Sequence, residues 1–174
     1  MGYTQYWEMN TNASNESWKQ FTAVAKRIVE HCNANGVVIV GGDGESDTNY
    51  VIDENVVIFN GLEDDSHETF YIGKNEDSKW NFCKTARKPY DIAVVACLVA
   101  ANKFGVIKGW SSDGDAEDHN AGYDLFETVL TDREELIDNV INQIRNDLIM
   151  GDVTAIAELL QNIPTQYLQG YLPE

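Results

Sequence analysis

The longest apolar stretch of the chain, residues 90–104, restricts the fold more than any other segment. It is rich in alanine and too long for an ordinary strand, so it predicts a buried helix, with Pro89 suited to the first turn. A helix that is apolar on all sides needs other elements around it. With 174 residues, the chain is long enough to form one domain with an appendage.

The elements expected around this helix follow from periodicity and turn residues. Residues 14–33 repeat apolar side chains at helical spacing after a cap at Ser14. Short strands are predicted in the aromatic N-terminal segment and further along the chain, at residues 3–9, 37–40, 51–52, 56–61, 69–72 and 106–110. We therefore predict an α+β ligand-binding domain over residues 1–130, in which a mainly antiparallel sheet packs with two helices.

The C-terminal part, residues 131–174, has a different pattern. A helix is expected near residues 123–130, and Thr131 then opens a capping box followed by an apolar stripe over residues 136–148. Gly151 breaks that second helix, and Pro164 ends the next one. The sequence predicts a C-terminal helical hairpin, whose apolar stripe is a candidate surface for forming a homo-oligomer.

The charge of the chain restricts its partners. It has 29 acidic and 12 basic side chains, for a formal net charge of -17. A surface of this sign repels phosphate backbones, so duplex nucleic acid is not expected as a partner. No apolar run is long enough for a membrane span, and the start of the chain lacks a secretion signal, so no membrane partner is expected. Three cysteines without a pairing pattern indicate a reduced, cytoplasmic protein.

Against this acidity, one segment is basic. Lys84, Arg87 and Lys88 place three cations within five residues, just before the predicted buried helix. Cations and backbone amides at a helix start suit a bound phosphate, and Tyr90 offers a ring or a hydroxyl beside it. The alternative is that these cations pair with neighbouring acids. No phosphate-loop pattern accompanies them.

Two further polar segments contain candidate site residues. Residues 64–69 include His67, a candidate general base that Glu68 or Asp65 would orient, or else a ligand-binding group. Residues 111–118 are rich in carboxylates of the kind that hold magnesium or calcium, although the spacing is not that of an EF-hand. The alternative is a solvated acidic loop whose serines cap the next helix. No cofactor is expected; the metal ligands, if a divalent metal binds, would be Asp64, Asp65, Asp113 and Asp115.

The segments GYTQYW (residues 2–7), FNG with DDSHETF (59–61 and 64–70), FCKTARKPYD (82–91) and SSDGD (111–115) together resemble a family of small, mostly uncharacterised bacteriophage and bacterial proteins. Separately, residues 151–174 are similar to a short tail found on other phage proteins. The resemblance implies a phage protein in the cytosol of an infected bacterium. It carries no established activity.

Together these observations predict a pocket for a small phosphorylated nucleotide. Its cations would be Lys84, Arg87 and Lys88, its stacking rings would come from Tyr3, Tyr6, Trp7 or Tyr90, and its orienting groups would be Ser66, His67, Thr69, Ser111, Ser112 and Asp113. Because small phage proteins with basic, aromatic pockets are similar in character to sponges for immune nucleotides, sequestration is the leading hypothesis. The alternatives are a metal-dependent enzyme that hydrolyses a nucleotide, with His67 moving a proton, and an acidic inhibitor that binds a host protein.

Overall fold

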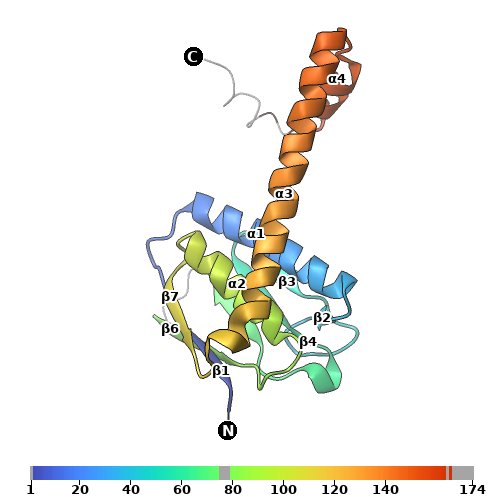
Figure 1. Ribbon diagram of the computed structural model, residues 1–174. Coiled ribbons are helices and arrows are strands. Elements are labelled where there is room, and N and C mark those ends of the chain that lie inside the picture. The colour runs from blue at the N-terminus through green and yellow to red at the C-terminus, as the bar shows by residue number, and fades with distance from the viewer. Residues whose placement is uncertain (1, 75–78, 164, 166–174) are drawn as a thin grey trace. The chain divides into compact units, whose positions relative to one another are not determined.

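The computed structural model describes residues 2–74, 79–163 and 165, and of residues 132–135 only the backbone. The fold is α+β, with antiparallel sheets, two helices packed on them and a helical C-terminal region, which confirms the predicted fold class (Figure 1). The chain divides into two compact units, residues 1–130 and residues 131–174.

A three-stranded antiparallel sheet forms one part of the first unit. Its central strand, β1 (Thr4–Met9), pairs with β6 (Trp80–Lys84) on one side and with β7 (Ile107–Ser112) on the other. The sequence pattern did not predict β6, which follows a polar interval. It also ended the last strand at residue 110, whereas β7 continues through Ser112 and so contains both serines of the SSDGD segment.

A second antiparallel sheet is built around β4 (Val56–Gly61). It pairs antiparallel with β5 (Phe70–Gly73), with β3 (Val51–Ile52) and, at its end, with β2 (Ile39–Val40). The short 3₁₀ helix η1 (Glu63–Asp65) follows β4. The predicted strands of this region are present, with β2 shortened to two residues.

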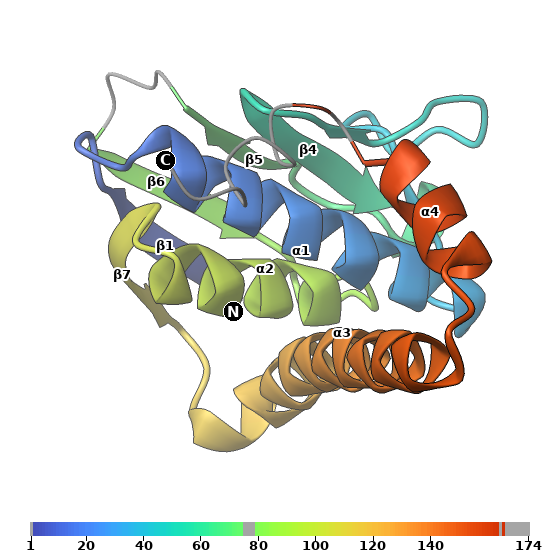
Figure 2. The same cartoon turned by 90° about the horizontal axis from the view of Figure 1, so that it is seen from above.

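Helices α1 (Asn15–Ala34) and α2 (Asp91–Lys103) lie side by side over the strands (Figure 2). The Ser14 hydroxyl caps α1 by accepting the Ser17 N–H at 3.0 Å, as the sequence predicts. Most of α2 is buried, which explains its apolar character on every side.

The core under these helices is aromatic. Phe70 of β5 packs against Trp7 of β1, with ring centroids 5.5 Å apart, and against Phe59 of β4 at 4.8 Å. Because strand side chains alternate between two faces, the same β1 strand turns Tyr6 and Glu8 away from this core.

The three cysteines, Cys32, Cys83 and Cys97, are buried and form no disulfide. Burial raises the pKa of the Cys32 thiol to about 11 and that of Cys83 to about 12. These thiols therefore stay protonated at neutral pH and pack as small apolar groups.

The helix α3 (Ala116–Met150) shows that the predicted break at Thr131 is wrong, because Thr131 lies inside one continuous helix of 35 residues. No glycine or proline interrupts the chain between Gly122 and Gly151, so the helix that begins at Ala116 continues through the capping-box sequence. Within the described residues, no helix has the length and apolar character required to span a membrane.

In the second unit, α3 ends at a turn where Gly151 has a φ of +73°, and α4 (Thr154–Gln161) follows. Ile144 of α3 and both Ile156 and Leu159 of α4 line a shared hollow of about 170 Å³. The predicted helix end at Pro164 lies outside the described residues.

Candidate functional site

The basic segment forms a tight turn between β6 and α2. Ala86 and Arg87 have φ angles of +51° and +58°, a left-handed conformation that costs free energy for residues with a side chain. The N–H groups of Thr85 and Ala86 both donate to the Tyr3 carbonyl at 3.2 Å, which ties the turn to β1. The chain therefore holds Arg87 in a fixed, strained position.

The Arg87 guanidinium has two partners. Its central carbon lies 4.1 Å from the centroid of the Tyr3 ring, and Nη2 donates to Oδ2 of Asp118 at 2.9 Å. The hydrogen bond from Arg87 lowers the pKa of the Asp118 carboxyl below its ordinary value. The charge of Arg87 is thus balanced by a carboxylate of the same chain. This is the alternative stated above, in which the cations pair with neighbouring acids.

The three cations point to different partners. Lys88 Nζ donates to the Asp64 carbonyl oxygen, while Lys84 lies on β6 opposite Thr4. Arg87 and Lys88 line one hollow, and Lys84 is not part of its described wall. The structure therefore does not gather all three cations around one anion position.

Beside Arg87 lies a buried polar cluster centred on Asp91. Its Oδ1 atom accepts the Thr85 hydroxyl at 2.6 Å and the Gln5 Nε2 amide at 3.0 Å. Gln5 and Thr85 are fully buried, and burial is the main reason why the pKa of Asp91 is raised. These hydrogen bonds lower the pKa again, but they do not cancel the effect of burial.

Among the described residues of this region, His119 Nε2 is buried without a hydrogen-bond partner, and Tyr3 Oη and Gln5 Oε1 have no partner in good geometry, although Gln5 and Ser112 lie close enough to Tyr3 to lower its pKa slightly against the effect of burial. Buried polar atoms without partners are uncommon in folded proteins. A hollow of about 240 Å³ opens at the same place, and its wall includes Tyr3, Arg87, Lys88, Asp91, Val95 and Asp118. We call this the Asp91 hollow. Its wall contains two cations, Arg87 and Lys88, two carboxyl groups, and apolar side chains of α2.

Three of the predicted stacking rings are buried, and this corrects the prediction. Trp7 and Tyr90 are 1% and 0% exposed and belong to the core. The Tyr90 hydroxyl donates to the Glu68 carbonyl at 2.7 Å, and burial raises its pKa. Tyr3 is 2% exposed, with Arg87 over its ring, and burial raises its pKa as well. Of the four candidate rings, Tyr6 is the one that stays accessible.

The DDSHET segment braces the fold. His67 Nδ1 and the Lys84 carbonyl are 2.8 Å apart, and Glu68 Oε2 accepts the Lys84 N–H at 2.8 Å. Both side chains thus engage the backbone of β6, and the hydrogen bonds of His67 and Glu68 described here do not join the two side chains. The hydroxyls of Ser66 and Thr69 donate to the carbonyls of Glu63 and Gly42, each at 2.5 Å, away from the Asp91 hollow.

Side chains of the SSDGD segment (residues 111–115) also form hydrogen bonds within the protein. Ser112 Oγ accepts the Gly114 N–H at 3.0 Å, and Asp113 Oδ1 accepts the Tyr6 hydroxyl at 3.3 Å. Asp115 Oδ1 accepts two N–H groups at the start of α3, from Glu117 at 3.0 Å and from Asp118 at 3.3 Å, as a helix cap does.

The predicted metal ligands are not brought together. No three His, Cys, Asp or Glu side chains in the described part of the chain are arranged to hold a metal ion. Asp64 and Asp65 lie in η1, whereas Asp113 and Asp115 lie between β7 and α3.

Sequence reasoning missed Gln5, Thr85, Asp91, Asp118 and His119 as members of the cluster. Gln5, Thr85 and Asp91 lie inside the segments GYTQYW and FCKTARKPYD, and Asp118 and His119 follow SSDGD by three and four residues. Their position inside or next to these segments was the available sequence signal. The burial that makes these groups unusual cannot be recognised from a sequence pattern.

The polar segments therefore converge at one end of the first unit, mainly through hydrogen bonds to one another. The likeness to phage proteins stays a prediction. Protein-family models, curated proteins and solved structures were each compared with this chain, and none of them matches it.

Proposed function

We propose that the first unit binds a small phosphate-bearing ligand of the nucleotide class in the Asp91 hollow and holds it without cleaving it. The observation that supports this most directly is the Arg87 guanidinium, which lines the hollow and is held by a solvent-accessible carboxylate, that of Asp118. Solvent screens such an exposed ion pair. A phosphate offers the guanidinium paired, charge-assisted hydrogen bonds, and so competes with Asp118.

Other groups of the hollow suit the same ligand. Lys88 adds a second cation, and its ammonium is held by a neutral carbonyl rather than by a carboxylate. Asp91 also lines the hollow, and because burial raises its pKa, protonating this carboxyl beside a bound phosphate costs less than it would for an ordinary aspartate. Ile92 and Val95 provide an apolar wall for a sugar or base. The volume, about 240 Å³, is below the range of about 300–1,000 Å³ common for ligand pockets, so the ligand is small or partly exposed.

Binding without turnover agrees with the positions of the candidate catalytic residues, His67 and Glu68. The side chains of His67 and Glu68 both contact the backbone of β6 and do not line the Asp91 hollow. Sequestration of a host signalling nucleotide is the role that the resemblance to phage proteins would give such a binder.

The test is calorimetric titration with inorganic phosphate and a panel of nucleotides. Arg87→Ala should weaken binding about tenfold or more, since a charge-assisted contact is lost. Arg145→Ala removes the same charge from the second unit and is the matched control. Asp118→Asn should strengthen binding, because it removes the carboxylate that competes with the ligand.

Two results would contradict the proposal. If Asp118→Asn weakens binding as much as Arg87→Ala, the ion pair only supports the turn and is not a site held ready for a phosphate. If a nucleotide recovered from heat-denatured protein is cleaved, and a chelator prevents the cleavage, the alternative of a metal-dependent enzyme is correct.

A further inference from the structure

The face of the β6–β1–β7 sheet that points away from α1 and α2 carries exposed aromatic rings. Trp7 of β1 points into the core, so its neighbours Tyr6 and Glu8 point to the opposite side. Tyr6 is directly opposite Phe82 on β6, and Glu8 is opposite Trp80. Phe82 is 59% exposed and Trp80 is 67% exposed. Large aromatic side chains exposed together on neighbouring strands mark an interaction surface.

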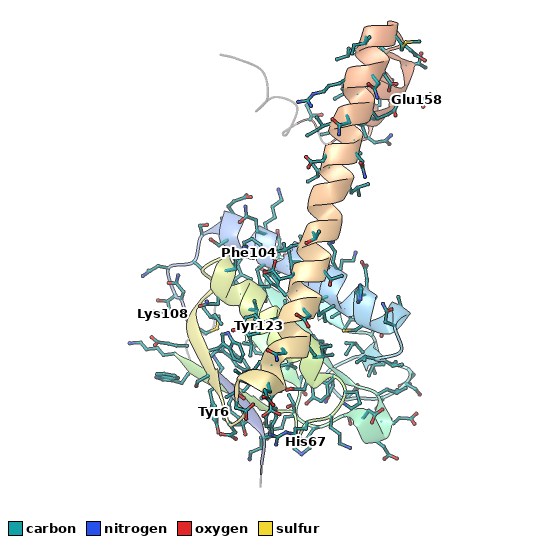
Figure 3. The ribbon with its side chains drawn as sticks, in the orientation of Figure 1. Tyr6, His67, Phe104, Lys108, Tyr123 and Glu158 are labelled. Atoms are coloured by element: carbon teal, nitrogen blue, oxygen red, sulfur yellow. The ribbon has the colours of Figure 1, made fainter. Side chains whose placement is uncertain are left out.

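This aromatic face contains a shallow hollow of about 260 Å³. Tyr6 and Trp80 line it together with Glu8, Lys108 and Gly109. Lys108 Nζ contacts Glu8 Oε1 at 2.5 Å, and Figure 3 shows Lys108 pointing outward from the edge of the domain. A Cβ atom on Gly109 would meet no atom within 4 Å, so this glycine leaves the hollow open where any side chain would begin to fill it.

The hollow is distinct from the Asp91 hollow, since the two have no lining residue in common. Its volume is small for a drug-sized ligand but sufficient for one protruding side chain of a partner protein. The inference that follows therefore does not depend on the proposed nucleotide site.

Charge decides which partner fits the aromatic face. A net charge of -17 opposes the approach of a phosphate backbone or of a second copy of the chain, and it attracts a basic protein. The faces of aromatic rings attract cations, and Glu8 supplies a carboxylate inside the hollow. The molecule already contains this type of contact, because the Arg87 guanidinium lies 4.1 Å from the centroid of the Tyr3 ring.

We propose that the aromatic face binds a basic segment of a partner protein and seats an arginine side chain in the hollow between Tyr6 and Trp80. Arginine fits better than lysine, because a planar guanidinium stacks on a ring and forms paired hydrogen bonds with a carboxylate. Glu8 would exchange Lys108 for the incoming arginine, which an exposed ion pair allows.

The experiment measures fluorescence anisotropy of labelled nona-arginine and nona-lysine peptides with the full chain. The two test variants, Phe82→Ala and Gly109→Val, leave the charge unchanged, so they separate ring contact from general attraction. Gly109→Val fills the hollow without meeting neighbouring atoms at its Cβ. Tyr71→Ala is the control, since Tyr71 is an exposed aromatic residue, 42% accessible, on the other sheet.

We expect both test variants to weaken nona-arginine binding about tenfold, and the control to have little effect. Nona-lysine should bind more weakly than nona-arginine and respond less to Phe82→Ala. The thermal midpoint of each variant establishes that it is folded. Nucleotide binding should be unchanged in Phe82→Ala, which keeps this test separate from that of the proposed function.

Three outcomes would overturn the proposal: no binding of nona-arginine at low salt, equal binding by all variants, or binding of a ten-nucleotide oligothymidylate that is tighter and equally sensitive to Phe82→Ala. The second would mean that the attraction is diffuse. The third would identify the aromatic face as a platform for single-stranded nucleic acid.

Discussion

Asp91 lies in an environment that its residue type does not predict. A carboxyl at the start of a helix is ordinarily stabilised in its charged form by the helix dipole. Here burial dominates and raises the pKa, although Thr85 and Gln5 both donate to Oδ1. The fold thus keeps an acid in a place that disfavours its ionised form, which is common where a group serves a function rather than stability.

The raised pKa makes the stability of the fold depend on pH. Because folded Asp91 holds its proton more tightly than the unfolded chain does, its contribution is most favourable below the ordinary aspartate pKa of about 4 and is lost as pH rises towards the raised value. Asp91→Asn keeps an oxygen for both donors and removes the titration. The free energy of unfolding of Asp91→Asn, relative to that of the natural chain, should therefore increase with pH across that window. The total increase should be about 1.4 kcal/mol for each pH unit by which folding raises the pKa of Asp91.

Urea denaturation of both proteins at several pH values measures this difference. Asp53→Asn is the control, as Asp53 is an exposed turn residue. A stability difference that stays constant with pH, or that falls as pH rises, would show that Asp91 is not disfavoured in its charged form.

At the scale of elements, the sequence was informative where periodicity is long and uninterrupted. Helix α1 and its Ser14 cap were predictable, as was the burial of α2, because both depend on local pattern. The strand β6 was not, since its exposed Trp80 and Phe82 alternate with Asn81 and Cys83 next to a polar interval, and its order comes from pairing with β1.

The candidate site was less predictable than the fold, for a related reason. Residue type predicted Arg87 and Lys88 as candidate anion-binding cations, but type does not reveal burial. Trp7 and Tyr90 therefore appeared available as stacking rings when they are core residues. Gln5 and Thr85 were marked only by lying inside two of the polar segments, because a buried amide or hydroxyl becomes notable only when its partner, Asp91, comes close through the fold.

The contact between α3 and α2 depends on one glycine. A Cβ atom on Gly122 would lie 2.4 Å from Val95 Cγ1 and 3.2 Å from the Ala96 nitrogen, so the two helices approach too closely for a methyl group. Alanine favours a helix over glycine by about 1 kcal/mol, whereas overpacking costs about 1–3 kcal/mol. We expect Gly122→Ala to lower the free energy of unfolding by up to about 2 kcal/mol.

Denaturant titration measures this change, and Gly109→Ala is the control, because its added methyl group meets open space. Equal stability of Gly122→Ala and the natural chain would mean that α3 moves away from α2 at little cost. Since Gly122 and Val95 also line the Asp91 hollow, the variant should weaken phosphate binding as well.

At the scale of the whole molecule, charge and exposed apolar surface act in opposite directions. A net charge of -17 keeps copies of the chain apart. The second unit nevertheless exposes large apolar side chains, among them Leu136 at 62%, Leu148 at 57%, Ile149 at 81% and Met150 at 83%. A surface of this kind is typical of an interface between protein chains.

We propose that the second unit mediates self-association, and that salt strengthens it. Salt screens the repulsion between acidic copies and leaves the burial of apolar surface intact. Between 0.05 and 0.5 M NaCl the Debye length shortens from about 14 Å to about 4 Å, so the fraction of oligomer should rise. The basic partner proposed for the aromatic face should show the reverse dependence, because its attraction is electrostatic.

Sedimentation of the full chain and of residues 1–130 at both salt concentrations decides the matter. The core cluster of the described residues lies between Trp7 and Val129, so the truncated chain should unfold cooperatively and remain monomeric at either concentration. Leu136→Lys with Ile149→Lys in the full chain should also give a monomer, whereas Val38→Lys, the same kind of change at one exposed apolar residue of the first unit, should not. Self-association of the truncated chain would place the interface in the first unit and contradict the assignment.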